Sequence, residues 1–290
     1  MDNNRKLHVG LIQMKCEQDK AKNVEKAVAY IHEAVSKNAQ IICFQELFNT
    51  QYFCFEENYK YFSLAESKDS DTFKILTRVA EENNIVIIVP YFEKRADGIY
   101  HNSTIVIDTD GTILGNYRKN HIPDDPGYLE KFYFTPGDTG YMVFKTSFAT
   151  IGVLICWDQW YPEAARITSL MGAEILFFPT AIGWETTENE SVRMDQLEAW
   201  FSIQKSHAIA NGVFVASVNR TGTENLTSFW GSSFISNPMG KILKQASIDN
   251  EEILVEELDL GQIDYYRTRW PFYRDRRVDT YQLLYKRFID

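Results

Sequence analysis

The sequence has few cysteines, and their spacing excludes a disulfide-stapled scaffold. Four of them (Cys16, Cys43, Cys54 and Cys156) are spread over 290 residues, and no two form a C-x-x-C pair. Four cysteines in a chain of this length do not form a disulfide framework. Each cysteine is therefore considered as a single thiol.

Long apolar runs and linker-like segments are also lacking. The apolar run near the start, Leu7 to Met14, is too short to span a membrane and lacks the small-residue cleavage site of a signal peptide. No Pro-, Gly- or Ser-rich stretch divides the chain. These features predict a cytoplasmic protein without a membrane partner, folded as a single domain over residues 1–290.

Positive charge is in deficit. The chain has 30 Lys and Arg against 40 Asp and Glu, a net charge of −10, and its basic residues are scattered apart from a short group between Arg267 and Arg277. This balance repels phosphate backbones, so nucleic acid is not expected as a partner. It is compatible with a cationic substrate, although such a charge ordinarily serves only solubility.

Apolar β-rich runs alternate with stretches of helical period along the whole chain. A hairpin is predicted with its turn at Asp108-Thr109-Asp110-Gly111. Strands are expected at residues 7–14, 40–48, 85–92, 103–107, 112–115, 141–145, 150–155, 174–179, 212–219, 231–236 and 253–258, and helices at residues 23–35, 71–83, 162–171 and 192–210. Two halves that each mix strands with helices favour a layered α/β sandwich over a single open sheet.

The end of the chain is unusually aromatic. Residues from about 266 to 290 include Trp270, Phe272, Tyr273, Tyr281 and Tyr285. Such a composition is unfavourable for a free terminus, so this tail is expected to dock on the body of the protein or on a partner subunit.

Cys156 is the cysteine best placed for chemistry. It ends the apolar run Ile151-Gly152-Val153-Leu154-Ile155 and precedes Pro162-Glu163, which suit the first turn of a helix. A strand-to-helix turn exposes a side chain and supplies free backbone N–H groups that can bind an oxyanion. Position alone leaves open whether Cys156 is a nucleophile or a small core residue.

A nucleophilic cysteine needs a base, and the sequence offers two kinds. His121 and His207 allow a Cys–His pair. Glu46, at the end of the apolar strand that begins at Ile41, is a charge that is costly to bury unless it is paired. Glu46 and Cys156 would both lie at strand carboxyl ends, where α/β sheets bind ligands. Lys119 follows the predicted hairpin and alone would be read as a solvated loop residue.

Three segments together resemble the nitrilase, or carbon–nitrogen hydrolase, superfamily. They are Gln45-Glu46-Leu47-Phe48, Tyr117-Arg118-Lys119-Asn120-His121-Ile122-Pro123 and Cys156-Trp157-Asp158-Gln159-Trp160-Tyr161-Pro162-Glu163. The resemblance covers nearly the whole chain and implies a four-layer αββα sandwich with a Glu-Lys-Cys triad, which maps onto Glu46, Lys119 and Cys156. It also implies that Glu130 supports the lysine and the substrate.

This resemblance implies a hydrolysis of a C–N bond that needs no metal and no other cofactor. Lys119 would favour the Cys156 thiolate, and Glu46 would carry the proton. Lys119 and the Trp157 backbone N–H would stabilise the oxyanion. Glu46 would then protonate the leaving nitrogen and activate water. Homo-oligomerisation is implied as well.

The residues after the cysteine bear on the substrate. Superfamily members that act on N-carbamoyl amino acids resemble one another in an arginine pair where this chain has Gln159 and Trp160, so an anionic substrate is disfavoured. A small ureido substrate with a distal ammonium is expected instead. Glu185 is the candidate for binding that ammonium, and the pocket walls are assigned to Tyr128, Trp157, Trp160 and Trp184.

Three alternatives remain at this point. The chain could be another ureido or amide hydrolase of the same superfamily that takes a carboxylate-bearing substrate. It could be a non-catalytic binding protein on this fold, in which case Cys156 would be inert toward iodoacetamide at neutral pH. It could also be a papain-like Cys–His hydrolase that uses His121 or His207.

Overall fold

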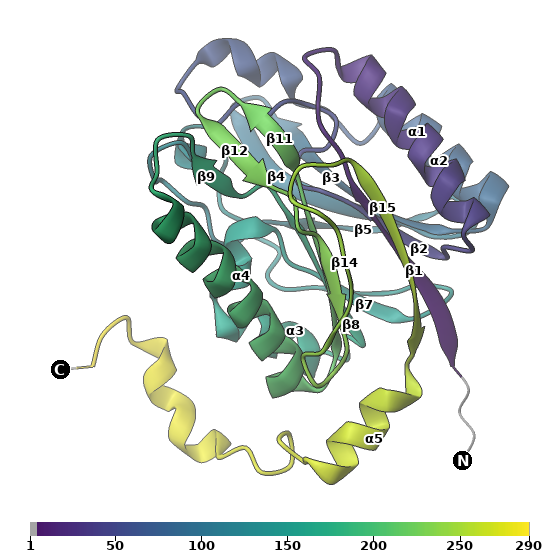
Figure 1. The fold of residues 1–290 in the computed structure, drawn as a ribbon, viewed down its shortest axis with the longest axis vertical. Coiled ribbons are helices and arrows are strands. Elements are labelled where there is room, and N and C mark those ends of the chain that lie inside the picture. Colours follow the sequence, from purple (N-terminus) through teal and green to yellow (C-terminus); the bar gives the residue numbers. More distant parts are fainter. Residues whose placement is uncertain (1–4, 290) are drawn as a thin grey trace.

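Two six-stranded sheets form the centre of the protein, with helices on their outer faces (Figure 1). The computed structural model describes residues 5–289. One sheet has the strand order β15-β1-β2-β3-β4-β5 and the other β14-β13-β10-β8-β7-β6. Helices α1 and α2 lie together on one side in Figure 1, and α3 and α4 lie on the opposite side. The predicted αββα sandwich is confirmed.

The elements have the following bounds. The helices are α1 (Lys20–Ser36), α2 (Asp71–Asn83), α3 (Pro162–Leu170), α4 (Glu190–Asn211) and α5 (Gly261–Arg269). The strands are β1 (Lys6–Gln13), β2 (Ile41–Phe44), β3 (Val86–Ala96), β4 (Ile99–Ile107), β5 (Ile113–Arg118), β6 (Val143–Lys145), β7 (Thr150–Val153), β8 (Ile175–Thr180), β9 (Gly183–Glu185), β10 (Phe214–Asn219), β11 (Thr221–Glu224), β12 (Thr227–Trp230), β13 (Phe234–Ser236), β14 (Ile242–Gln245) and β15 (Glu252–Asp259).

Alternation along the strands explains the layers. In β2, Ile41 and Cys43 face the core between the two sheets, whereas Ile42 and Phe44 face the core under α1 and α2. Successive side chains of a strand point to opposite faces, so a strand that is apolar throughout must be covered on both sides. β2 is therefore fixed between a helix layer and a second sheet, and the chain that leaves its carboxyl end starts deep in the protein.

Local signals set the helix and hairpin boundaries. Asp19 caps α1 by accepting a hydrogen bond from the backbone N–H of Ala21 at 2.9 Å. Asn84 caps the end of helix α2, and its φ of 52° is the left-handed conformation that asparagine tolerates. The hairpin of β4 and β5 turns at residues 108–112, as its Asp and Gly content predicts.

The expected strand over residues 40–48 is shorter in the structure. β2 ends at Phe44, and residues 46–49 form a turn in which Leu47 has a φ of 51°. The apolar pattern continues because Leu47 and Phe48 are also fully buried, but in a turn. Burial without strand geometry is the reason that the pattern overestimates the strand.

A small third sheet and helix α5 have no counterpart among the predicted elements. The sheet has the order β11-β12-β9, and β12 pairs antiparallel with both neighbours. Its strands have only three or four residues, too few to show a period. This sheet joins the segment after β8 to the segment after β10, close to the candidate site described below.

The segment after α5 extends away from the two sheets as an arm (Figure 1). Its first part contacts the body, where the Tyr273 ring lies 5.4 Å from the Arg166 guanidinium and 4.6 Å from that of Arg267. The remainder is exposed, including Leu284 (67%) and Tyr285 (96%). The last residue of the predicted tail, Asp290, lies outside the described residues. No helix among residues 5–289 is both long and apolar enough to cross a membrane.

Candidate active site

Four residues that the sequence singles out lie in turns and loops that follow strands. Glu46 comes two residues after β2, Lys119 follows β5 directly, and Cys156 comes three residues after β7. Glu130 begins a short 3-10 helix in the loop after β5. Because strands end at the edge of a sheet, these loops gather side chains that are far apart in the sequence.

Lys119 bridges two buried carboxylates. Its Nζ donates to Glu46 Oε1 at 2.8 Å and to Glu130 Oε2 at 2.7 Å. All three side chains have 0% exposure. Burying a charge is strongly unfavourable unless it is paired and hydrogen-bonded. Each of these three side chains therefore depends on its partners in the cluster to be buried as a charge.

Two further side chains hold the carboxylates in place. Asn102 Nδ2 donates to Glu46 Oε1 at 2.7 Å, and the Tyr52 hydroxyl donates to Glu130 Oε1 at 2.9 Å. The second oxygen of Glu46, Oε2, is buried and has no hydrogen-bond partner among the described residues. A buried acceptor without a partner is rare, and it leaves Glu46 one oxygen with which to take up a proton.

Burial and charge shift the pKa values of this cluster in different directions. Burial, aided by Glu46, raises the pKa of Glu130 to about 7 although Lys119 opposes the shift. Burial alone would lower the pKa of Lys119, but Glu130 and Glu46 raise it well above its ordinary value. Lys119 therefore stays a cation, and the protonation of Glu130 changes near neutral pH.

The surroundings of Cys156 favour the thiol over the thiolate. Burial and the charge of Glu46 raise its pKa well above the ordinary value, and Lys119 only partly offsets this rise. The effect expected of Lys119 has the right sign, but it does not dominate. If Cys156 is to act as a nucleophile, a base must remove the proton of its thiol.

The turn that carries Cys156 is strained and firmly held. Cys156 has a φ of 42°, and it opens the 3-10 helix Cys156–Trp160 immediately before α3. Asp158 caps this turn by accepting from the backbone N–H of Ile155 at 3.0 Å and from the Tyr117 hydroxyl at 2.7 Å. A non-glycine residue at positive φ persists only where its surroundings hold it, and such positions cluster at functional sites.

The two candidate histidines have other partners. His121 Nδ1 lies 2.7 Å from Asp158 Oδ1, and its ring stacks on Tyr161 at 3.7 Å. His207 Nε2 lies 2.7 Å from the backbone oxygen of Gln159. Within residues 5–289 neither ring is hydrogen-bonded to Cys156, so the Cys–His reading gains no support from the geometry.

The residues expected to bind substrate differ in how deeply they are buried. Trp157 and Trp160 are half-buried with ring centroids 6.5 Å apart, and the Tyr128 hydroxyl accepts from the backbone N–H of Gly183 at 2.9 Å. Trp184 is buried, and its Nε1 donates to the Arg193 carbonyl at 2.9 Å. Glu185 ends β9 with an exposed side chain, outside the buried cluster.

Gln159 does not face the substrate side. Its Oε1 accepts from Trp200 Nε1 and from Gln204 Nε2, both at 2.9 Å, and the side chain is fully buried under α4. The Gln159 side chain is therefore bound by residues of α4. The inference from Gln159 and Trp160 to the charge of the substrate stays a prediction.

The sequence reasoning missed Tyr52, Asn102, Asp158 and Arg220. Arg220 follows the apolar strand β10 directly and is fully buried. This is the signal that drew attention to Glu46, a charge at the end of a buried strand, and it would have found Arg220 as well. Tyr52 and Asn102 carry no such signal, because a loop tyrosine and a strand asparagine are common.

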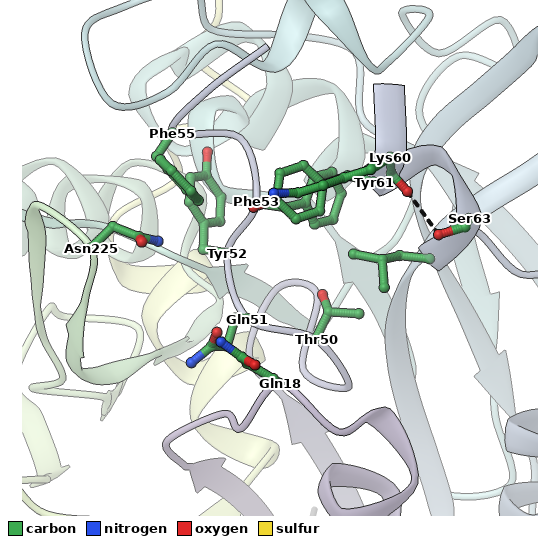
Figure 2. Close-up of a pocket in the computed structure, with 11 residues that line it drawn as sticks. Gln18, Thr50, Gln51, Tyr52, Phe53, Phe55, Lys60, Tyr61, Ser63 and Asn225 are labelled. Atoms are coloured by element: carbon green, nitrogen blue, oxygen red, sulfur yellow. Dashed lines mark hydrogen bonds between the residues drawn. The ribbon is translucent and has the colours of Figure 1, made fainter. Parts of the chain in front are cut away.

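A pocket of about 420 Å³ lies beside the segment that follows Glu46 (Figure 2). Its lining includes Thr50, Gln51, Tyr52 and Phe53 from this segment, and Lys60, Tyr61, Ser63 and Leu64 from the short helix that follows. Tyr52 therefore borders this pocket while its hydroxyl reaches Glu130. Among residues 5–289 no three His, Cys, Asp or Glu side chains are grouped so as to hold a metal ion.

Comparisons with known proteins agree on one family. The carbon-nitrogen hydrolase family model matches residues 8–268. N-carbamoylputrescine amidase of Oryza sativa is 46% identical over 96% of this chain and 94% of its own length, and citrullinase of Francisella tularensis is 39% identical over 97% and 99%. The crystal structure of a carbon-nitrogen hydrolase from Helicobacter pylori superposes with a TM-score of 0.95 at 43% identity, covering 98% of this chain and 100% of the other.

Proposed function

This chain belongs to the carbon–nitrogen hydrolase family, and we propose that it hydrolyses N-carbamoylputrescine to putrescine, carbon dioxide and ammonia. The observation that carries the chemistry is the buried cation of Lys119 between Glu46 and Glu130, at 2.8 and 2.7 Å. The choice of substrate is supported by the relative of that name, which matches nearly the full chain.

The reaction begins with a proton transfer. Glu46 Oε2, which has no partner among the described residues, accepts the proton of the Cys156 thiol. The thiolate attacks the ureido carbonyl, and the carbonyl oxygen takes up negative charge. Lys119 and the Trp157 backbone N–H stabilise this oxyanion, which removes part of the barrier that water alone would leave.

Collapse of the tetrahedral intermediate breaks a C–N bond. Glu46 returns its proton to the leaving nitrogen, and Cys156 holds the remaining carbonyl group as a thioester-like intermediate. Glu46 then activates a water molecule that releases the acyl group as a carbamic acid, and the proton taken from water returns to the Cys156 thiolate. The carbamic acid loses carbon dioxide, which breaks the remaining C–N bond. Glu130 keeps Lys119 oriented throughout, because it accepts a hydrogen bond from one of the three N–H groups of the ammonium.

The far end of the substrate carries an ammonium group. We assign its recognition to Glu185, with Tyr128, Trp157, Trp160 and Trp184 as pocket walls. The exposed side chain of Glu185 lies on β9, whose first residue, Gly183, is tied to the Tyr128 hydroxyl. An exposed carboxylate attracts a cation without the desolvation penalty of a buried one.

A substrate panel tests the function. Ammonia release is measured with N-carbamoylputrescine, citrulline, N-carbamoyl-β-alanine and a simple aliphatic amide, with Cys156→Ala as the control for background. N-carbamoylputrescine is expected to give the highest kcat/KM. Preference for citrulline would show that this chain acts like the citrullinase relative and not on N-carbamoylputrescine. Preference for N-carbamoyl-β-alanine would contradict the inference that the substrate is a cation.

We also propose that the protein is cytoplasmic, that residues 1–290 act as one carbon–nitrogen hydrolase domain, and that the exposed aromatic arm joins copies of the chain into a homo-oligomer. Leu284, Tyr285 and Phe288 are 67%, 96% and 80% exposed in the isolated chain. Light scattering on the full chain and on a chain that ends before Val278 compares their masses. A monomeric full chain would contradict this assignment.

A further inference from the structure

Arg220 contacts the backbone of the segment that carries Glu46 and Tyr52. Its Nη2 donates to the carbonyl of Glu46 at 3.0 Å and to that of Leu47 at 2.8 Å. Its Nη1 donates to the Thr50 carbonyl at 2.8 Å. A planar guanidinium can reach several carbonyls at once, which a lysine ammonium cannot reproduce with the same geometry.

Glu224 completes this arrangement. Its Oε1 accepts from Arg220 Nη1 at 2.8 Å, and its Oε2 accepts from the backbone N–H of Tyr52 at 2.6 Å. Both side chains of the ion pair are buried, at 0% and 5% exposure. The pair therefore fixes four backbone groups between residues 46 and 52, one at each end of the segment and two within it.

Each end of this segment controls one carboxylate around Lys119. Glu46 supplies the first carboxylate itself, and Tyr52 orients the second through its hydroxyl bond to Glu130. The segment is not a regular element: residues 46–49 form a turn with Leu47 at positive φ, and residues 50–53 border the pocket of about 420 Å³ (Figure 2). Leu47, Tyr52 and Phe53 are buried in an apolar cluster, but no helix or sheet hydrogen-bond ladder holds this segment, so side-chain hydrogen bonds to its backbone add to its rigidity.

We propose that Arg220, with Glu224, is a positioning residue that sets the distance and angle of both carboxylates relative to Lys119 without contacting the substrate. This inference rests on the proposed function, since it concerns the same site. Misplacement of a reacting group by about 1 Å costs on the order of 100-fold in rate, so a contact behind the site can have a catalytic effect.

The principal test is the Arg220→Lys variant, which keeps the charge and the pairing with Glu224 but loses the planar guanidinium that donates to several carbonyls. Provided that the variant folds, kcat is expected to fall by about 10- to 100-fold, whereas KM changes by less than about threefold. Arg267→Lys is the control, because Arg267 is partly buried and, like Arg220, donates to a backbone carbonyl, that of Asn211 at 3.1 Å. A kcat within about twofold of the unchanged enzyme would overturn the proposal.

A double-mutant cycle separates positioning from general loss of stability. Arg220→Lys and Tyr52→Phe should be clearly non-additive in kcat, because the second change removes the bond through which the first one acts on Glu130. Additive effects would contradict the proposal. If Arg220→Lys does not fold, Glu224→Gln takes its place in the same cycle and is judged by the same criterion.

A substrate-independent readout keeps this inference distinct from the proposed function. The rate at which iodoacetamide alkylates Cys156, followed by peptide mass analysis across pH, reports on the base that activates the thiol. Arg220→Lys is expected to slow alkylation and to shift its pH profile, and Arg267→Lys to leave both unchanged. An unchanged profile in Arg220→Lys would count against positioning, even if every substrate in the panel had failed.

Discussion

Replacing Lys119 by methionine should destabilise the protein in a pH-dependent way. The change keeps most of the side-chain volume but leaves the carboxylates of Glu46 and Glu130 without their shared cation, at 0% exposure for both. Removing one partner of a buried ion pair costs about 3–5 kcal/mol. We expect a loss of that size in the free energy of unfolding at about pH 8.

Protonation should relieve part of this loss. In the unchanged protein the pKa of Glu130 is already raised from the ordinary value of 4.5 to about 7, and Lys119 holds it down from a higher value. Without Lys119 the folded-state pKa rises further, so the folded form binds a proton that the unfolded form releases above about pH 4.5. Stability is then greatest at low pH and falls as the pH rises through the folded-state pKa.

Urea unfolding followed by tryptophan fluorescence measures both effects. At about pH 5.5, where Glu130 is protonated, the remaining penalty should be about 1–3 kcal/mol, the cost of an unsatisfied buried polar group. Lys131→Met is the control, because Lys131 is an exposed lysine of the same loop, and it should cost less than about 0.5 kcal/mol. An equal loss at both pH values, or a loss below about 1 kcal/mol at the higher one, would refute the buried ion cluster.

Three further outcomes are expected. Glu185→Gln should lower kcat/KM for N-carbamoylputrescine by about tenfold and leave a neutral ureido analogue unaffected, and an equal effect on both substrates would remove Glu185 from ammonium binding. Tyr52→Phe should move the acidic limb of the kcat/KM profile to higher pH, because the Tyr52 hydrogen bond lowers the pKa of Glu130 and its loss raises that pKa; the ionised form of Glu130 holds Lys119, and an unmoved limb would contradict this role. His121→Ala and His207→Ala should each keep the rate of Cys156 acylation within about tenfold, and a larger loss in single-turnover kinetics would restore the Cys–His alternative.

Long elements with a clear period could be predicted from the sequence. Helix α2 begins and ends at the residues that its pattern indicates, and the β4–β5 hairpin turns where an Asp-Gly sequence suggests it. The alternation of strands and helices indicated a layered α/β sandwich, and the family resemblance implied its αββα order. Strands that are apolar on both faces fit this order, because they need a cover on each side. The three-stranded sheet was missed because strands of three or four residues show no period.

The site was only partly predictable, for a physical reason. Charges at the ends of buried strands, such as Glu46, are conspicuous because burial makes an unpaired charge costly. The direction in which a buried polar side chain points is not visible in a sequence, and Gln159 faces α4 although it follows Cys156 by only three residues. The same limit hid the bond of Tyr52 to Glu130, which depends on tertiary packing across 78 residues.

The most direct test of the account is the mass of Cys156 during turnover. The protein is mixed with N-carbamoylputrescine, quenched in acid within one turnover and digested. The mass of the peptide that contains Cys156 is then measured by mass spectrometry. The account predicts a covalent adduct on this cysteine whose mass also tells which nitrogen leaves first, and it predicts that the adduct is absent in Glu46→Gln, which cannot take the thiol proton. Turnover with Cys156 unmodified, or an adduct on another residue, would contradict the assignment of Cys156 as nucleophile.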